Sequence, residues 1–415
     1  MRSLIGLSML ASLFAAPAFL AGAHRSRTDW HARTSSYLLE GQQERELMHG
    51  LIQKPLPKPE EMDRLIQSAV ESGADEGKLR GLASQGMMKL LAAPEILFVW
   101  QRTWPEFRDV PELILASRTG YSDKVLQLIR RGDNPDVAQD DGTTPLIAAS
   151  EAGSEEIVKY LITAGARPNI QASDGRTALM AAAYVRSTAV AKLLLEAGAD
   201  ANLFDRDGVT ALFLSARSGN SDLTNLLLEE KSIVDRRAKN GWTALMYAAQ
   251  GGSAEIVERL IQAGASVETA DVYGQTPLIV AAHSPSVLRI LLKQNAEVNH
   301  RDADGETALI RAAADDQSLG PGNLQAISLL LAHGADADVD AQDNEGRTAL
   351  MRACAYDDPG IVRLLLDHGA SPQTKDRQGR TSLSIAISAK NQAIVDELRR
   401  NPGGGALESE TPKSK

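Results

Sequence analysis

Residues 141–173 read DGTTPLIAASEAGSEEIVKYLITAGARPNIQAS, and the pattern of this stretch recurs along most of the chain. A glycine returns mostly every 33 residues, a threonine follows two positions later, and a leucine follows two further on. The glycines that carry this register are Gly142, Gly175, Gly208, Gly241, Gly274, Gly305, Gly346 and Gly379. A fixed period of this length is typical of a repeat architecture, in which each unit buries its apolar face against its neighbours.

The residues of one repeat predict its local structure. An Asp-Gly pair that ends at Gly142 supplies the positive φ of a tight hairpin turn. Thr144 can cap a helix whose first residue is Pro145, and small residues follow in this helix. A second stretch has apolar residues at helical spacing and ends at Gly165, which favours a left-handed cap. Each repeat is therefore expected to be a turn, a short helix, a turn and a second helix.

The chain resembles the ankyrin repeat over residues 109–400, because its Gly-x-Thr-Pro/Ala-Leu opening and endings such as LLEAGAD at 194–200 match that family. The resemblance implies an all-α solenoid of stacked helix-turn-helix repeats with β-hairpin-like loops. It implies about nine units, of which the first and last are degenerate. It also implies a binding scaffold whose hairpin tips and first helices form a concave surface.

Two repeats depart from the pattern at the position of the second helix cap. Lys231 and Asn295 stand there in place of glycine, and lysine tolerates the left-handed conformation less well than asparagine does. Both are predicted weak joints. The Gly305 repeat carries an insertion around 315–324, which either lies on a binding face or is neutral.

The chain begins with a segment typical of a targeting signal. Residues 1–23 combine Arg2, a long uncharged stretch and small residues before a possible cleavage site, as in a secretory signal peptide. The chain is then expected to be periplasmic or secreted. In the alternative, the segment is retained and anchors the chain in a membrane.

Other segments flank the repeats. Residues 24–59 have the composition of a linker, and residues 401–415 are expected to form a disordered tail. Residues 60–108 contain amphipathic helical patterns. They are interpreted as a helical N-terminal cap that covers the open end of the array, and an autonomous partner-binding domain is the alternative.

Composition and motifs argue against catalysis. The chain has a net charge of −10 and no basic block, which disfavours non-specific nucleic-acid binding. Its one cysteine, Cys354, replaces a small residue of a helix, and no cofactor motif or metal-ligand spacing occurs. No enzyme activity, cofactor, metal or small-molecule substrate is therefore expected. Alternating aspartates at 336–343 could hold calcium or could form a solvated acidic loop.

A partner-binding surface is predicted from aromatic and arginine side chains at hairpin tips and first helices, since these residue types dominate interface energetics. An acidic groove in a partner would suit the arginines. In the alternative, the aromatic residues only pack between repeats. The candidate residues are Tyr184, Arg217, Arg237, Trp242, Tyr247, Tyr273, Arg311, Arg352 and Tyr356.

Three functions follow from these observations. The first is a non-catalytic scaffold that binds a partner protein through the concave face and stabilises or inhibits an envelope protein. The second is a secreted effector that acts on a host protein. The third, an enzyme with its activity in residues 24–108, is disfavoured because that span lacks a paired acid and base constellation.

Overall fold

A computed structural model describes residues 59–71, 73–84, 93–103, 109–314, 324–355 and 358–401. These residues form helices and turns and no strand, and they divide into two compact units, one up to Val110 and one from Pro111. The predicted signal peptide at 1–23, nearly all of the linker and the tail beyond residue 401 lie outside the described residues. No described helix combines the length and the hydropathy that crossing a bilayer requires.

The first unit consists of three described helices, α4 (Pro59–Glu71), α5 (Glu76–Ser84) and α7 (Pro94–Thr103). Helix α4 contacts both others, and Ile66, Leu79 and Phe98 are buried between them. Lys78 Nζ pairs with Glu95 Oε1 at 2.6 Å. The helices expected within 60–108 are therefore present, whereas their role as a cap on the repeat array stays a prediction.

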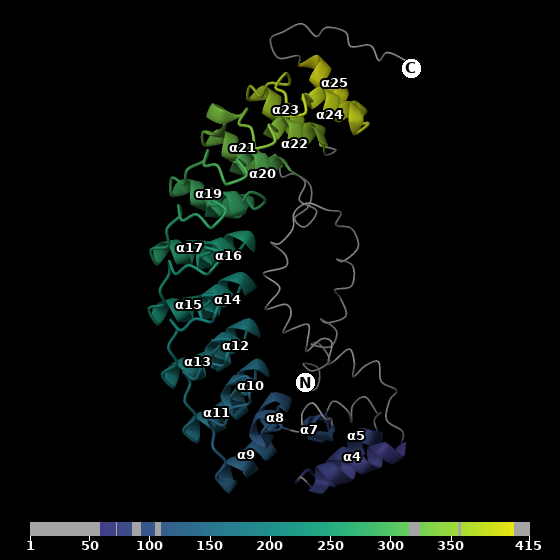
Figure 1. Cartoon of the computed structure of the whole chain (residues 1–415), viewed down its shortest axis with the longest axis vertical. Helices are drawn as coiled ribbons and strands as arrows, with labels where there is room; N and C mark the ends of the chain where they lie inside the picture. Colours follow the sequence, from purple (N-terminus) through teal and green to yellow (C-terminus); the bar gives the residue numbers. More distant parts are fainter. Residues whose placement is uncertain are drawn as a thin grey trace. The chain divides into compact units, whose positions relative to one another are not determined.

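The second unit is a stack of helix pairs (Figure 1). The first helices of the described repeats are α8 (Glu112–Thr119), α10 (Pro145–Glu151), α12 (Ala178–Tyr184), α14 (Ala211–Ser218), α16 (Ala244–Gln250), α18 (Pro277–Val280), α20 (Ala308–Ala313), α22 (Ala349–Ala355) and α24 (Ser382–Ser388). The second helices are α9 (Ser122–Arg131), α11 (Glu155–Thr163), α13 (Thr188–Glu196), α15 (Ser221–Glu229), α17 (Ala254–Gln262), α19 (Pro285–Lys293), α21 (Leu324–Ala332), α23 (Pro359–Asp367) and α25 (Gln392–Arg400). A 3₁₀ turn, η2 (Ala335–Asp338), follows α21. This arrangement confirms the predicted all-α stack of helix-turn-helix repeats.

Each first helix contacts the first helix of the next repeat, and each second helix does the same. The small residues that open the first helices make this close packing possible, and Ala148 and Ala149 are fully buried in α10. Thr144 caps that helix by accepting a hydrogen bond from the Ile147 amide at 3.3 Å. Gly165 follows α11 with a φ of 90°. The predicted caps at both ends of the repeat are thus confirmed.

The two substituted cap positions adopt the conformation expected of them. Lys231 has a φ of 57° and Asn295 a φ of 58°, although neither is a glycine. Arg186 and Lys390 are also left-handed, with φ values of 62° and 59°. These two residues lie in the turn between the helices of their repeats, a position that the sequence analysis did not single out.

Candidate partner-binding surface

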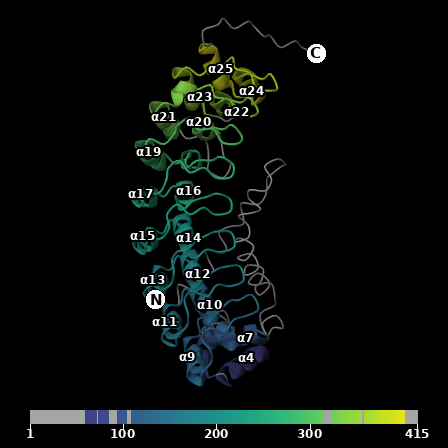
Figure 2. The ribbon, with the colours of Figure 1, turned by 60° about the vertical axis from the view of Figure 1, so that its left-hand side comes forward.

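The loops that precede the turn glycines form a row beside the first helices (Figure 2). Each loop closes on itself through its backbone, as where the Asp205 amide donates to the Val209 carbonyl at 3.0 Å. Each loop also bonds to the next, as where the Lys239 amide donates to the Asp207 carbonyl at 2.8 Å. The repeated backbone bonds fix the direction in which the loop side chains point.

Burial alternates along each loop from the Gly175 repeat onward. The residue three positions before the glycine is buried, while the residues two and four positions before it face outward. This follows from the period-two alternation of side chains in extended backbone. The loops therefore present one face to solvent and one face to the array.

Aspartate occupies the buried position in most of these loops. We call these residues the loop aspartates: Asp205, Asp271, Asp302, Asp343 and Asp376. Oδ1 of Asp205 accepts hydrogen bonds from the amides of Asp207 and Val209 at 2.8 and 2.9 Å. The same pair of bonds recurs in the other four loops. One carboxylate oxygen thus holds the turn together.

The second carboxylate oxygen distinguishes the loop aspartates from one another. Oδ2 of Asp271 accepts from Trp242 Nε1 at 2.9 Å, and Oδ2 of Asp376 accepts from Arg380 Nε at 2.8 Å. Oδ2 of Asp205 is buried and has no hydrogen-bond partner. The equivalent of Arg380 in its loop is Val209, which has no donor to offer.

Asp205 and Asp376 differ in how readily their carboxyl groups ionise. Burial raises the pKa of Asp205 to about 6, against the opposing effect of the two amide bonds. Burial also opposes the ionisation of Asp376, but hydrogen bonds from the Arg380 amide and guanidinium outweigh it and lower its pKa. The ionised form of Asp376 therefore stabilises its loop at neutral pH, and Asp205 does not gain this stabilisation.

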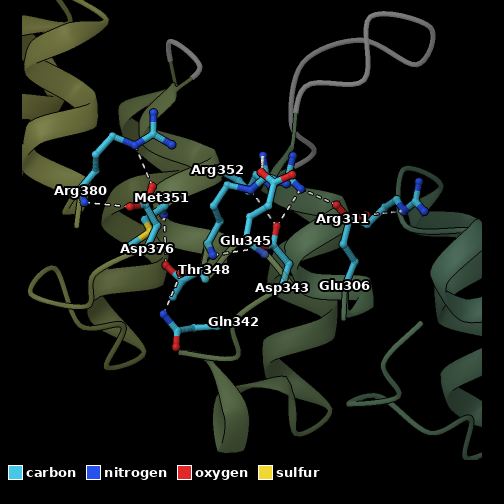
Figure 3. A network of polar contacts seen from close by, with 12 residues as sticks. Glu306, Arg311, Gln342, Asp343, Glu345, Thr348, Met351, Arg352, Asp376 and Arg380 are labelled. Carbon is cyan, nitrogen blue, oxygen red and sulfur yellow. Dashed lines mark hydrogen bonds and ion pairs between the residues drawn. The ribbon is translucent and has the colours of Figure 1, made fainter. Parts of the chain in front are cut away.

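Two predicted site residues, Arg311 and Arg352, belong to an ionic joint between the Gly305 and Gly346 repeats (Figure 3). Arg352 is buried, and its Nη2 contacts both Glu306 and Asp343, the latter at 3.0 Å. Arg311 lies 3.4 Å from Glu306 and 3.6 Å from Asp302. The guanidinium of Arg352 is thus paired within the array, and its predicted contact with a partner stays a prediction.

Trp242 is also buried within the array. Its side chain is only 2% exposed, because the indole lies in the joint toward the next repeat and donates to Asp271. Tyr247 packs against Trp242, with ring centroids 4.9 Å apart. On its other side, Tyr247 lies near Phe213 of the preceding repeat, with ring centroids 5.9 Å apart. The structure therefore brings Trp242 and Tyr247 together, as packing between repeats rather than as an open aromatic cluster.

Four predicted residues do reach the surface. Tyr184 at the end of α12 is 50% exposed, and Tyr273 at a loop tip is 47% exposed. Arg217 in the last turn of α14 is exposed. Arg237 is also exposed, although its Nη2 donates to the Ala270 carbonyl at 2.6 Å. Tyr356 lies outside the described residues, as do residues 315–323 of the insertion predicted at 315–324.

Cys354, Asp340 and Asp343 are buried or bonded within the array. Cys354 is fully buried, and burial raises the pKa of its thiol to about 12, so it stays protonated at neutral pH. Asp340 accepts the Ser371 amide at 2.8 Å, and Asp343 pairs with Arg347 and Arg352. Among the described residues, no group of three or more His, Cys, Asp or Glu side chains could hold a metal ion.

Sequence reasoning missed two features of this surface. Phe204 is 47% exposed in its loop, and the guanidinium carbon of Arg236 lies 4.2 Å from the centre of its ring. The second feature is the set of loop aspartates, of which the sequence pattern at 336–343 indicates only a possible calcium loop that includes Asp343. Their recurrence three positions before the turn glycine was the available signal.

The chain is similar to proteins of known family and structure. A family model described as ankyrin repeats (3 copies) matches residues 113–205, 198–271, 266–339 and 318–405. Among solved structures, the crystal structure of the human ASB11 ankyrin repeat domain is similar, with 26% sequence identity and a TM-score of 0.47. That alignment covers 53% of this chain and 96% of the other. None of the curated proteins that were compared matches the chain.

Proposed function

Because the chain belongs to the ankyrin repeat family, we propose that it is a non-catalytic scaffold that binds a partner protein through the loops and first helices of its array. Ankyrin repeats generally mediate protein–protein interaction, and stacked repeats create extended concave binding surfaces. The observation that carries the proposal for this chain is the exposure of Tyr184 and Tyr273, in an array that buries most of its large apolar side chains.

Arginine adds to this surface. Arg217 is exposed and close enough to Tyr247 to influence the pKa of its hydroxyl, which burial raises. Tyrosine and arginine are enriched among the residues that dominate interface energetics. The backbone bonds between loops hold these side chains in place, so binding costs little ordering entropy.

The proposal also includes the cellular location of the chain. We assign to residues 1–23 the export of the chain, and to the array the binding of an envelope protein that it stabilises or inhibits. The uncharged N-terminal segment supports this assignment. Cell fractionation tests it, because a secreted effector would be recovered outside the envelope fractions.

The experiment is capture of proteins from an envelope extract by the full chain, followed by mass spectrometry and titration of the purified captured protein. Tyr184→Ala combined with Tyr273→Ala should weaken its affinity by about tenfold or more. Both side chains are largely exposed, so the melting temperature should change little.

Tyr160→Ala is the matched control, because Tyr160 lies on the second helix α11, where its hydroxyl donates a hydrogen bond to Glu156 of the same helix at 2.7 Å. This variant should bind the captured protein as the unmodified chain does. Equal affinity of the double variant and the unmodified chain would move the site elsewhere. Failure of the chain to bind any purified candidate would overturn the proposed function.

A further inference from the structure

The outward face of the loop row carries a stripe of positive charge. It consists of the side chains two and four positions before the turn glycines, which alternation turns toward solvent. From the Gly175 repeat to the Gly379 repeat these positions hold Gln171, Ser173, Phe204, Arg206, Arg237, Lys239, Ala270, Val272, Arg301, Ala303, Gln342, Asn344, Lys375 and Arg377. Six are cationic and none is a carboxylate. We call these six cations the basic stripe.

The absence of carboxylates from these positions differs from the composition of the whole chain, in which 54 carboxylates outnumber 44 cationic side chains. Within the described residues, Arg206, Lys375 and Arg377 form no side-chain hydrogen bond or ion pair. Lys239 has only a distant neighbour, Asp207, at 3.6 Å, and its side chain is 70% exposed. Most of the basic stripe is therefore available to an incoming anion.

Apolar side chains accompany the central part of the stripe. Phe204 is exposed beside Arg206, and Val272, which is 58% exposed, follows Lys239 in the next loop of the row. The Val272 amide bonds the Asn240 carbonyl at 3.2 Å, so these two loops are adjacent. An anionic ligand that also carries apolar groups would fit this part of the surface better than a purely ionic one.

The repeat spacing favours an extended chain as the ligand. Packed helices lie about 8–10 Å apart, and a peptide in the extended polyproline-II conformation rises about 3.1 Å per residue with three residues per turn, so every third side chain faces the same way and meets the next repeat. We infer that an extended acidic polypeptide segment, with carboxylates about three residues apart and apolar side chains between them, binds along the basic stripe over the Gly208 to Gly274 repeats. This inference rests on the proposed binding function and specifies its partner.

A polypeptide fits better than a nucleic acid, because carboxylates border the stripe at the loop tips. Asp174, Asp207 and Asp304 each lie one position before a turn glycine, next to the stripe. A continuous phosphate backbone would pass these carboxylates as well as the cations, whereas a peptide can present neutral residues there.

The test measures fluorescence anisotropy of a labelled peptide of about 15 residues, built from Glu-Leu-Ser triplets, on titration with the full chain. Peptides built from Gln-Leu-Ser and Lys-Leu-Ser triplets serve as neutral and cationic counterparts. The acidic peptide should bind at least about tenfold more tightly than either. Its affinity should fall as salt rises from about 50 to about 300 mM, since exposed charges are screened.

Arg206→Glu combined with Lys239→Glu should lower the affinity for the acidic peptide by about tenfold or more. The matched control is Lys159→Glu with Lys192→Glu, the same change of charge at exposed positions of the second helices α11 and α13. The control should stay within about twofold of the unmodified chain. Equal losses in the two variants, or equal binding of the three peptides, would overturn the inference.

Two further outcomes separate this inference from the proposed function. A thymidine oligonucleotide of the same length that bound more tightly than the acidic peptide would assign the stripe to nucleic acid and overturn the polypeptide partner. If the Arg206→Glu and Lys239→Glu variant still binds the captured envelope protein while the Tyr184→Ala and Tyr273→Ala variant does not, the scaffold function stands and the stripe is excluded from it.

Discussion

Nε1 of Trp242 donates a hydrogen bond to Oδ2 of Asp271 at 2.9 Å, across the joint between two successive repeats. Oδ1 of the same aspartate accepts two amides of its own loop, from Tyr273 and Gln275. The indole is therefore tied to the turn of the following repeat. The largest fully buried side chain of the array thus couples two repeats instead of serving as an open contact for a partner.

We expect Trp242→Phe to lower the free energy of unfolding by about 1–3 kcal/mol, because Oδ2 of Asp271 would stay buried without its donor. Trp242→Ala should cost about 3–5 kcal/mol, since it also leaves a cavity. Urea denaturation followed by circular dichroism measures both. Val272→Ala, in the exposed part of the neighbouring loop, is the control and should change stability by less than about 0.5 kcal/mol. An unchanged midpoint for Trp242→Phe would contradict the assigned hydrogen bond.

Asp205→Asn should stabilise the chain at neutral pH by about 1–2 kcal/mol, because it removes an ionised carboxylate whose Oδ2 is buried without a partner. The folded-state pKa of about 6 lies above the usual value of 3.8. The folded chain therefore keeps a proton that the unfolded chain has lost between about pH 4 and pH 6. The contribution of Asp205 to stability accordingly falls as pH rises through this window. Chemical denaturation at a series of pH values should show the gain of the variant vanish below about pH 4.

Asp376→Asn is the matched control, and we expect it to change the free energy of unfolding in the opposite direction. The pKa of Asp376 is lowered, with Arg380 Nε at 2.8 Å from its Oδ2, so the ionised form stabilises the folded chain above the usual carboxyl pKa. Substitution should therefore destabilise at neutral pH, and the difference should shrink as pH falls below the usual carboxyl pKa of 3.8. Equal signs for the two variants would contradict the distinction between paired and unpaired loop aspartates.

The comparison of Asp205 with Asp376 shows what the sequence could predict and what it could not. Period and caps depend on local chemistry, so the helix pairs and the left-handed Lys231 could be read from neighbouring residues. For Asp205 and Asp376, the presence of a cation depends on the residue four positions later, which is Val209 in one repeat and Arg380 in the other. Asp302 instead lies 3.6 Å from Arg311 of the following helix.

The candidate site was harder to predict because exposure depends on neighbouring repeats. Trp242 occupies a loop-tip position, and its burial requires the next loop and the correct register of Asp271. Arg352 likewise became buried through Glu306, which precedes it by 46 residues. Tyr184 and Tyr273, which the sequence predicts as partner-binding residues, are exposed in the structure, and their contact with a partner stays a prediction.

Lys231→Gly should raise the free energy of unfolding by about 0.5–1 kcal/mol. Lys231 has a φ of 57°, and this left-handed conformation is unfavourable for a residue with a Cβ atom but not for glycine. Asn295→Gly should gain less, since asparagine tolerates this region better. Thermal unfolding of the two variants compares them directly. A midpoint for Lys231→Gly at or below that of the unmodified chain would contradict the strain assigned to this position.

Gly175→Ala and Gly165→Ala separate backbone strain from close approach, because both glycines have a φ of 90°. A Cβ atom on Gly175 would lie 2.7 Å from Cα of Asp205, whereas one on Gly165 would meet nothing within 4 Å. The first substitution should therefore cost about 1–3 kcal/mol more than the second, which carries only the left-handed penalty of about 1–2 kcal/mol. Since the contact is made with the next loop, Gly175→Ala should also speed amide exchange at Arg206, whose amide bonds the Asp174 carbonyl at 2.7 Å. Denaturation and hydrogen exchange measure the two effects, and equal losses of stability would show that the loops do not approach one another this closely.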